Sequence, residues 1–177
     1  MDFFEAAYAR QSIRAFTSQP IEPRKLQRIL EAANAAPSAG NLQAYEIFAV
    51  TRHATLEALV AAARLKTRGQ DYIAQAPIAL VFCAHPARSV PRFGSRGETL
   101  YCLQDATIAC AYAQLAVAAL ELGSVWIGSF DEVAVRQAIG ASDELRPIVI
   151  LPIGYAAETP DRSARRTLDD LVYYVAA

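Results

Sequence analysis

The chain has 177 residues, of which 54% are hydrophobic and 20% are charged, and its formal net charge is −1. This size and composition predict one globular domain, residues 1–177, with a sizeable core and no disordered segment. A net charge near zero excludes the strongly basic face on which nucleic-acid binding depends. Asp2 and Glu5 stand at the start with no apolar run behind them, so we expect no secretory signal and a cytoplasmic location.

The first half of the chain alternates helical and strand patterns. A helix is expected over residues 3–9 with Asp2 as its N-cap, and a second over residues 23–34, which begins with proline and ends before Pro37. The elements expected next are a strand at residues 45–50, a helix at 55–65, a helical turn at 70–75 and a continuous apolar, hence central, strand at 77–83.

The second half begins with a segment rich in Pro, Ser, Gly and Arg, residues 86–97, which predicts the most mobile loop of the chain. A long helix is expected over residues 98–122. The elements expected after it are a strand starting at 125–127, a helix at 132–139, a strand at 146–155, a polar linker from 156 and a stretch at 168–175 that fits either helix or strand. This order predicts an α+β fold with a mixed central sheet flanked by helices.

The apolar stretch at residues 106–122 approaches the length of a membrane span. Polar residues interrupt it and precede it, namely Gln104, Asp105, Thr107, Gln114 and Glu121, which argues against insertion in a bilayer. Its alanine-rich filling suits close packing from several sides, so we expect this helix in the centre of the core or in a subunit interface.

Competing chemistries find little support in the sequence. The only histidines, His53 and His85, lie in no nucleophile or zinc motif, and no Gly-x-Gly-x-x-Gly fingerprint of a dinucleotide crevice occurs. The cysteines Cys83, Cys102 and Cys110 are odd in number and lack metal-ligand spacing, so we expect buried free thiols and no metal site.

Arg10, Ser12 and Arg14 alternate in sequence, so an extended backbone would point all three side chains to one side. Arginine offers a fork of donors that matches phosphate oxygens, and a serine hydroxyl adds one more hydrogen bond. Solvated surface charges are the alternative interpretation, and for an arbitrary arginine pair it is the commoner one.

Three other segments combine polar or flexible residues with a possible ligand role. Residues 37–43 have the composition of an ordinary turn, Trp126 before Gly128 fits a core aromatic at a glycine turn, and Arg162, Arg165 and Arg166 fit a charged linker. From the residues alone these structural interpretations are the simpler ones.

Four motifs in this order, however, resemble the nitroreductase-like FMN flavoprotein family. They are Arg10-Gln11-Ser12-Ile13-Arg14-Ala15-Phe16, Ala36-Pro37-Ser38-Ala39-Gly40-Asn41-Leu42-Gln43, Gly123-Ser124-Val125-Trp126-Ile127-Gly128 and Leu151-Pro152-Ile153-Gly154-Tyr155. The resemblance implies the family's fold and a homodimer with the long helix at its centre and two FMN molecules at the subunit interface. The chain departs from the family at Ala44-Tyr45, where Pro-Trp is usual, and this affects the expected strand entry more than the cofactor.

The resemblance also implies roles for individual residues. Arg10 and Ser12 would hold the FMN phosphate, and Arg14 the N1/C2 region of the ring. The 37–43 loop would reach the ring from the neighbouring subunit, residues 126–128 would offer a backbone N–H to flavin N5, and Arg165 or Arg166 would close over the phosphate. The full set of implied cofactor-binding residues is Arg10, Gln11, Ser12, Arg14, Pro37, Ser38, Ala39, Asn41, Gln43, Gln70, Trp126, Ile127, Gly128, Arg165 and Arg166.

By this resemblance the protein is an oxidoreductase that passes electrons from NAD(P)H through bound FMN to a small organic acceptor, such as a nitroaromatic or quinone, in a ping-pong cycle. NAD(P)H binds transiently over the flavin, and no side chain is expected to act as a general acid or base. Two alternatives stay open: an FMN storage or redox-sensing protein, and a specialised family reaction such as flavin destruction or reductive dehalogenation.

Overall fold

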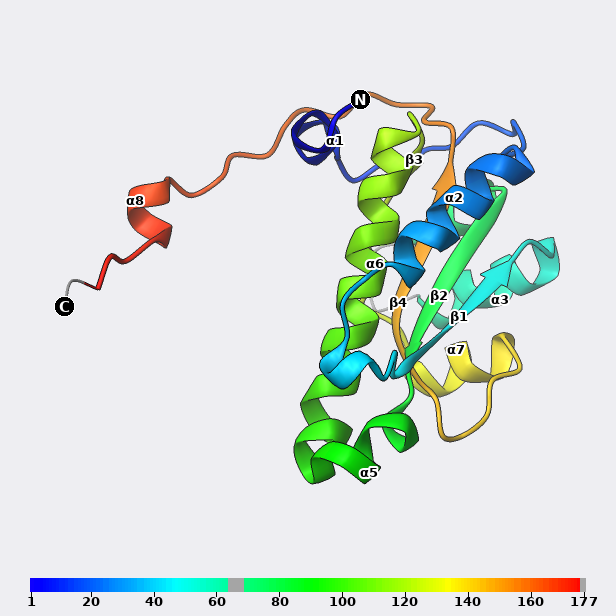
Figure 1. Cartoon of the computed structure of the whole chain (residues 1–177). Helices are drawn as coiled ribbons and strands as arrows, with labels where there is room; N and C mark the ends of the chain where they lie inside the picture. Colours follow the sequence, from blue (N-terminus) through cyan, green and yellow to red (C-terminus); the bar gives the residue numbers. More distant parts are fainter. Residues whose placement is uncertain (64–68, 176–177) are drawn as a thin grey trace.

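The computed structural model describes residues 1–63 and 69–175 and shows a four-stranded sheet between helices (Figure 1). The strands are β1 (Tyr45–Val50), β2 (Ile78–Ala84), β3 (Gly123–Ser124) and β4 (Arg146–Gly154). The helices are α1 (Phe3–Ala9), α2 (Pro23–Asn34), α3 (His53–Ala62), α4 (Tyr72–Gln75), α5 (Pro86–Arg96), α6 (Cys102–Ala119), α7 (Glu132–Ala138) and α8 (Leu168–Leu171), with a 3-10 turn η1 (Ala39–Asn41) and a π-helical segment η2 (Gly97–Tyr101). The α+β class is confirmed.

The sheet has the strand order β1-β2-β4-β3, and these strands pair antiparallel. Outside these four strands, an isolated parallel bridge joins Ser12 to Ser124. This bridge attaches the segment between α1 and α2 to the edge of the sheet. The Arg10–Arg14 region is therefore fixed to the core soon after α1 ends.

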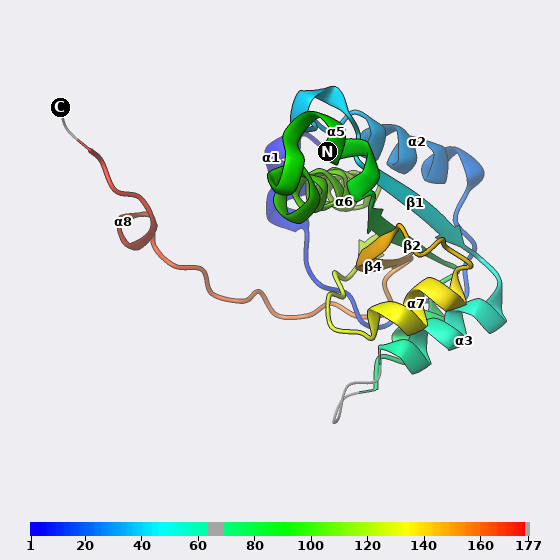
Figure 2. The ribbon, with the colours of Figure 1, turned by 90° about the horizontal axis from the view of Figure 1, so that it is seen from below.

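Helices cover both faces of the sheet, with α2 and α6 on one and α3 and α7 on the other (Figures 1 and 2). The buried strand β2 serves both layers, because alternate side chains point to opposite faces. Leu80 and Phe82 pack in the α2–α6 cluster, whereas Ala79 and Val81 pack in the α3–α7 cluster. Every residue of β2 is buried, as its unbroken apolar sequence predicts.

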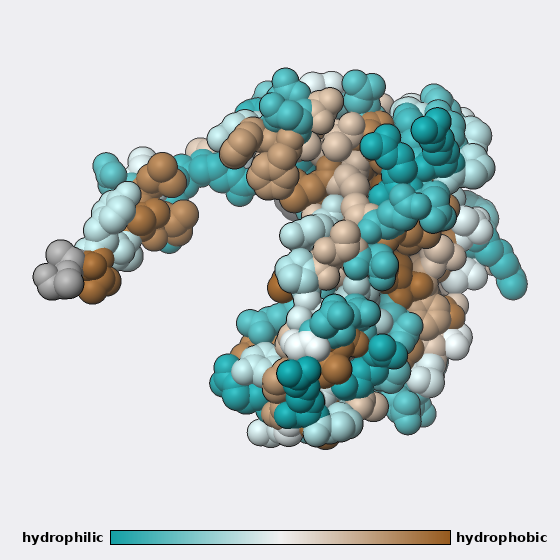
Figure 3. All heavy atoms as spheres, in the orientation of Figure 1, coloured by the Kyte–Doolittle hydropathy of each residue, from teal (hydrophilic) through white to brown (hydrophobic). Residues whose placement is uncertain are grey.

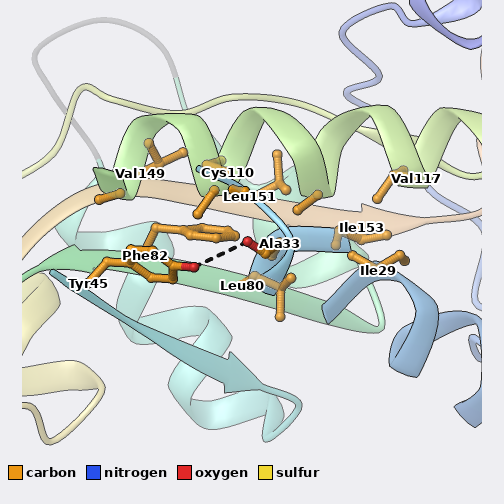
Figure 4. Close-up of a cluster of buried hydrophobic side chains, with 14 of the residues drawn as sticks. Ile29, Ala33, Tyr45, Leu80, Phe82, Cys110, Val117, Val149, Leu151 and Ile153 are labelled. Atoms are coloured by element: carbon orange, nitrogen blue, oxygen red, sulfur yellow. Dashed lines mark hydrogen bonds between the residues drawn. The ribbon is translucent and has the colours of Figure 1, made fainter. Parts of the chain in front are cut away.

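The α2–α6 cluster contains side chains from α2, β1, β2, α6 and β4 (Figure 4). Tyr45 stands where the family named above usually has tryptophan. Its ring lies among the residues of this cluster. Its hydroxyl donates a hydrogen bond of 3.2 Å to the carbonyl oxygen of Ala33 in α2. The strand entry therefore forms without the Pro-Trp pair, because the phenol finds a buried acceptor at the helix end.

The expected long helix is present as α6, which continues from α5 through η2. Ala106, Ala109, Cys110 and Ala113 are fully buried along its length, and small side chains let the helix lie close to the sheet. Among the described residues, no helix is long and apolar enough to span a bilayer.

The segment at residues 86–97 is helical, and the prediction of a mobile loop was wrong. Pro86 starts α5, Ser89 is buried, and Gly97 packs so closely that an added Cβ would lie 2.7 Å from the Ser89 carbonyl oxygen. Gly94 bends the segment at φ 56° and ψ −139°, a conformation suited to glycine. The turn-forming residues thus serve a bent, packed helix rather than a loop.

Smaller differences occur at element ends. The strand expected from residue 125 is instead β3 at 123–124, and Ile127 makes only an isolated bridge to Ile150. The helix expected over 55–65 is observed as α3, and its predicted last residues, 64 and 65, lie outside the described residues. In the stretch at 168–175, residues 168–171 form a single helical turn, α8, and residues 172–175 have no regular secondary structure.

The three cysteines are buried and free, as predicted. Burial raises the pKa of the Cys83 thiol to about 12, with a smaller contribution from Glu46. Since the thiolate is the reactive form, this raised pKa lowers the reactivity of Cys83 at neutral pH.

Gly97→Ala tests whether residues 86–97 are packed. In a mobile loop this substitution would stabilise the protein by about 0.4 to 1 kcal/mol through the unfolded chain. Against the Ser89 carbonyl we expect a loss of about 1 to 3 kcal/mol, measured from urea unfolding. Ser95→Ala, at an exposed position of the same segment, is the control and should change stability little. An increase in stability for Gly97→Ala would contradict the packed helix.

Candidate functional site

A cavity of about 420 Å³ opens where the end of α1, the segment after it and the C-terminal tail meet. The first segment contributes Arg10, Gln11, Ser12 and Arg14. The tail contributes Pro160, Asp161, Arg162, Ser163 and Arg165. Residues 150 positions apart in sequence thus face one space, and most of the charged groups among them are cationic.

The backbone of residues 10–14 is held by the sheet edge. Ile13 N donates a hydrogen bond of 3.0 Å to Ser124 O, and the Ile13 side chain is buried against Gly123. A Cβ on Gly123 would lie 2.9 Å from Ile13, so glycine is required for this close approach. Arg10, Ser12 and Arg14 all line the cavity, as predicted, but Gln11 between them lines it as well, so the side chains of this segment do not simply alternate between two sides.

The electrostatics of this cavity favour an anion. The pKa of Arg10 is lowered, first by burial and then by the positive charge of Arg165. Within the described part of the chain neither arginine takes part in an ion pair. The two positive charges repel each other, so a negatively charged ligand bound between them would stabilise both. The planar guanidinium group of arginine matches the geometry of phosphate oxygens.

A second cavity, of about 530 Å³, adjoins the first and shares Arg14 with it. Its other lining residues are Gly69, Gln70, Tyr72, Trp126, Ile127, Gly128 and Ser129. Aromatic rings, a side-chain amide and exposed backbone around one space suit a flat, polar-edged ring system. Arg14 therefore stands between an anion site and a site for a heterocycle.

Gln70 and Tyr72 are held by hydrogen bonds in the second cavity. The Tyr72 hydroxyl donates to Gln70 Oε1 at 2.9 Å, and Gln70 Nε2 donates to Ala63 O at 3.1 Å. Burial raises the pKa of Tyr72, while the charge and hydrogen bond of Arg14 oppose that rise. Tyr72 thus fixes Gln70 and lies beside Arg14, a position that its sequence context did not indicate.

Gln11 has an unsatisfied buried atom. Its Oε1 has no hydrogen-bond partner within the described residues, although the side chain lines the first cavity. A buried acceptor without a partner costs about 1 to 3 kcal/mol, and a ligand hydroxyl would remove this cost.

The C-terminal arginines differ in position. Arg165 lines the first cavity, whereas Arg166 Nη2 donates to the carbonyl oxygen of Asp170 and lies outside it. Arg162 also lines the cavity, and its Nη2 donates to Tyr8 O at 2.6 Å. Of the two sequence candidates, only Arg165 is brought to the site.

The 37–43 loop is not brought to either cavity in this chain. It lies at the start of α6, whereas Ala118 and Glu121 at the far end of α6 lie beside Arg10 and Gln11. Thirteen residues of helix between Asp105 and Ala118 correspond to roughly 20 Å. Of the predicted residues, Pro37, Ser38, Ala39, Asn41 and Gln43 are therefore separated from the rest.

Asp105 shapes this loop from beneath. Its carboxylate is only 2% exposed and accepts hydrogen bonds from Ala39 N at 2.9 Å and Ala44 N at 3.2 Å. Ser38 Oγ accepts a further bond from Gln43 N at 3.0 Å. Gly40, Asn41 and Gln43 all have positive φ, so the loop is held in a tight and costly conformation. The only sequence signal for this anchoring role was that Asp105 is the acidic residue in the first turn of the apolar helix α6.

Comparison with known proteins places these features in a family. The family model described as the Nitroreductase family matches residues 7–155. An NADH dehydrogenase of Thermus thermophilus is 30% identical over 98% of this chain and 96% of its own length, and an oxygen-insensitive NADPH nitroreductase of Salmonella typhimurium is 29% identical over 96% of this chain and 72% of its own. The structure of an NADPH:FMN oxidoreductase from Vibrio harveyi complexed with NAD⁺ superposes with a TM-score of 0.86 at 26% identity, covering 97% of this chain and 76% of that one.

Proposed function

The chain belongs to the nitroreductase family, and we propose that it is an oxidoreductase that passes electrons from NAD(P)H through bound FMN to a small organic acceptor, such as a nitroaromatic or a quinone. The observation that carries the proposal is the pair of adjoining cavities that share Arg14, one cationic and one lined by aromatic and backbone groups. The names of its relatives, an NADPH nitroreductase and an NADPH:FMN oxidoreductase, support the cofactor and the reaction class.

The residues present fit FMN along its length. Arg10 and Arg165 would bind the phosphate dianion through their positive charges, and Ser12 would add a hydrogen bond. Gln11 Oε1, buried and without a partner, would accept a hydrogen bond from a ribityl hydroxyl. The ring would lie in the second cavity, with Gln70 at its edge and the backbone of residues 126–128 beside it.

Arg14 would act on the ring electrostatically. When bound, FMN supplies the hydride and electron chemistry, so the chain needs no general acid or base. A guanidinium placed at the N1/C2 edge stabilises the negative charge that develops there on reduction, and it does so more strongly in a partly desolvated site. Tyr72, which lines the same cavity, would help to orient Arg14 for this role.

A second copy of the chain would complete the site. The 37–43 loop lies at the other end of α6 from its own cavities, so it can reach a flavin only on a partner subunit. The C-terminal arm, residues 167–175, extends away from the body and carries apolar side chains beside the hollow that separates it from the body (Figure 3). Leu168 is 74% exposed and Tyr174 is 94% exposed, which a partner surface would cover. We therefore include a homodimer in the proposal.

The absorbance spectrum of the purified protein tests the proposed function. We expect the two visible bands of oxidised flavin, their loss on anaerobic addition of NADPH or NADH, and their return on addition of a quinone or nitroaromatic. Protein without flavin that also fails to bind added FMN would refute the cofactor. Bound flavin that neither nucleotide reduces would instead favour a storage or redox-sensing protein.

Substitution of the cavity arginines tests the phosphate site. Arg10→Ala should weaken FMN binding about ten- to a hundredfold, as expected for loss of a charged hydrogen bond worth about 1.5 to 3 kcal/mol. Arg165→Ala should weaken it in the same direction. Arg166→Ala is the matched control, because that side chain lies outside the cavity. Equal affinities for all three variants and the wild type, measured by fluorescence on dilution, would remove Arg10 and Arg165 from the site.

The arm provides a test of the dimer. Leu168→Glu combined with Leu171→Glu places charge on side chains that are exposed within one chain, so the fold of the body should be unaffected. In a dimer the same charges would be buried, and we expect at least a tenfold weaker association by sedimentation analysis. Val133→Glu, on exposed α7, is the control. A wild-type protein that remains a flavin-loaded monomer at micromolar concentration would contradict the dimer.

A further inference from the structure

A row of unneutralised arginines lies along the segment from α5 to η2, away from the proposed phosphate site. Residues 86–97 contain Arg88, Arg92 and Arg96 and no acidic residue. All three arginines are exposed, and within the described ranges none forms an ion pair. We call these three side chains the α5 arginine surface. It holds three positive charges in a protein whose formal net charge is −1.

The contacts of these arginines orient them and leave their charge free. Arg88 Nε donates to Leu42 O at 3.2 Å and Arg92 Nη1 donates to Gly40 O at 3.1 Å. Arg96 Nε donates to the Tyr101 hydroxyl at 3.1 Å. Each acceptor is neutral, and each guanidinium has five N–H donors, so most donors remain available to a ligand.

Aromatic rings support two members of the surface. The Arg92 guanidinium lies 5.3 Å from the centre of the Phe93 ring, and the Arg96 guanidinium lies 5.3 Å from that of Tyr101. The two rings pack edge to face with centres 5.1 Å apart. Such stacking reduces the side-chain freedom that an arginine loses on binding, so the surface is partly organised for an anion.

The position of the surface relates it to the proposed reaction. Arg88 and Arg92 are four residues apart on α5 and both hold carbonyl groups of the 37–43 loop. The proposed function places this loop against the flavin of the partner subunit. The α5 arginine surface then borders the mouth of that flavin site.

We propose that the α5 arginine surface binds the 2′-phosphate of NADPH and makes the protein selective for NADPH over NADH; this rests on the proposed function. The nicotinamide must lie over the flavin ring to deliver hydride, so the adenosine end must lie outside the ring cavity. The 2′-phosphate is a dianion that NADH lacks, and arginine is the side chain that best matches its geometry. A carboxylate-bearing acceptor is the other anionic substrate that such a surface would attract.

The first experiment measures binding without turnover. Adenosine 2′,5′-bisphosphate and 5′-AMP are titrated calorimetrically into the flavin-loaded protein. The first carries the 2′-phosphate and should bind at least tenfold more tightly. Arg92→Gln and Arg96→Gln should each reduce this difference, whereas Arg24→Gln on exposed α2 should leave it unchanged. Equal binding of the two nucleotides by the wild type would overturn the inference.

The second experiment compares kcat/KM for NADPH and NADH with one uncharged acceptor. The wild type should favour NADPH at least tenfold, and Arg92→Gln and Arg96→Gln should each lower the ratio several-fold. Because Arg92 also holds the loop, a loss that is equal for both nucleotides would indicate a structural role and overturn the inference for Arg92. Arg96 does not contact the loop in this way and provides the independent variant.

The outcomes separate this inference from the function on which it rests. A flavin-loaded protein that uses NADH and NADPH equally well would refute the selectivity and leave the oxidoreductase intact. A different result is that Arg92→Gln and Arg96→Gln change kcat/KM for 4-nitrobenzoate but not for 4-nitrobenzamide, while the ratio of kcat/KM for NADPH to that for NADH is unchanged. That result would assign the surface to anionic acceptors and overturn the proposal. A protein that neither nucleotide reduces would refute the proposed function itself.

Discussion

The pairing of residues 10–14 with the edge of the sheet is the contact on which the candidate site depends. One hydrogen bond from Ile13 N to Ser124 O and the burial of Ile13 over Gly123 fix the segment. Arg14 is then placed between the two cavities. The same stretch of chain that pairs with Ile13 continues into residues 126–128 of the second cavity. A shift of this pairing would move the cationic groups and the backbone of the ring site relative to each other.

The length of α6 divides the functional residues into two groups. One group lies near the C-terminal end of this helix, and the 37–43 loop lies near its N-terminal end, roughly 20 Å away. A rigid helix packed on a sheet cannot bring these groups together within one chain. Two copies can do so if they associate along their helices in opposite directions, because each loop then lies near the partner's cavities. In such an arrangement the partner chain would cover both the open cavities and the exposed apolar side chains of the arm.

The sequence predicted features that depend on neighbouring residues better than those that depend on distant ones. The grouping of Arg10, Ser12 and Arg14 and the burial of the apolar run of β2 depend on local sequence, and both are observed. The helix at residues 86–97 was missed because its Pro, Ser and Gly residues favour turns locally, and only the packing of Gly97 on Ser89 selects the bent helix. Asp105 was missed as a loop anchor because Ala39 and Ala44 are more than 60 residues away. Arg165 was distinguished from Arg166 only by the path of the tail.

The 37–43 loop is anchored by a buried acid and by exposed arginines, which bind different backbone groups of the loop. Asp105 is buried, and its oxygens accept backbone N–H groups, so it needs no arginine partner. Arg88 and Arg92 approach the same loop from outside and take its carbonyl groups instead. Backbone N–H groups at the loop donate to the carboxylate of Asp105, and backbone carbonyl oxygens of the loop accept from Arg88 and Arg92. Among the described residues no carboxylate pairs with these arginines, so their positive charge stays available to a ligand. The buried acid and the exposed arginines thus stabilise the same loop from opposite sides of its backbone hydrogen bonding.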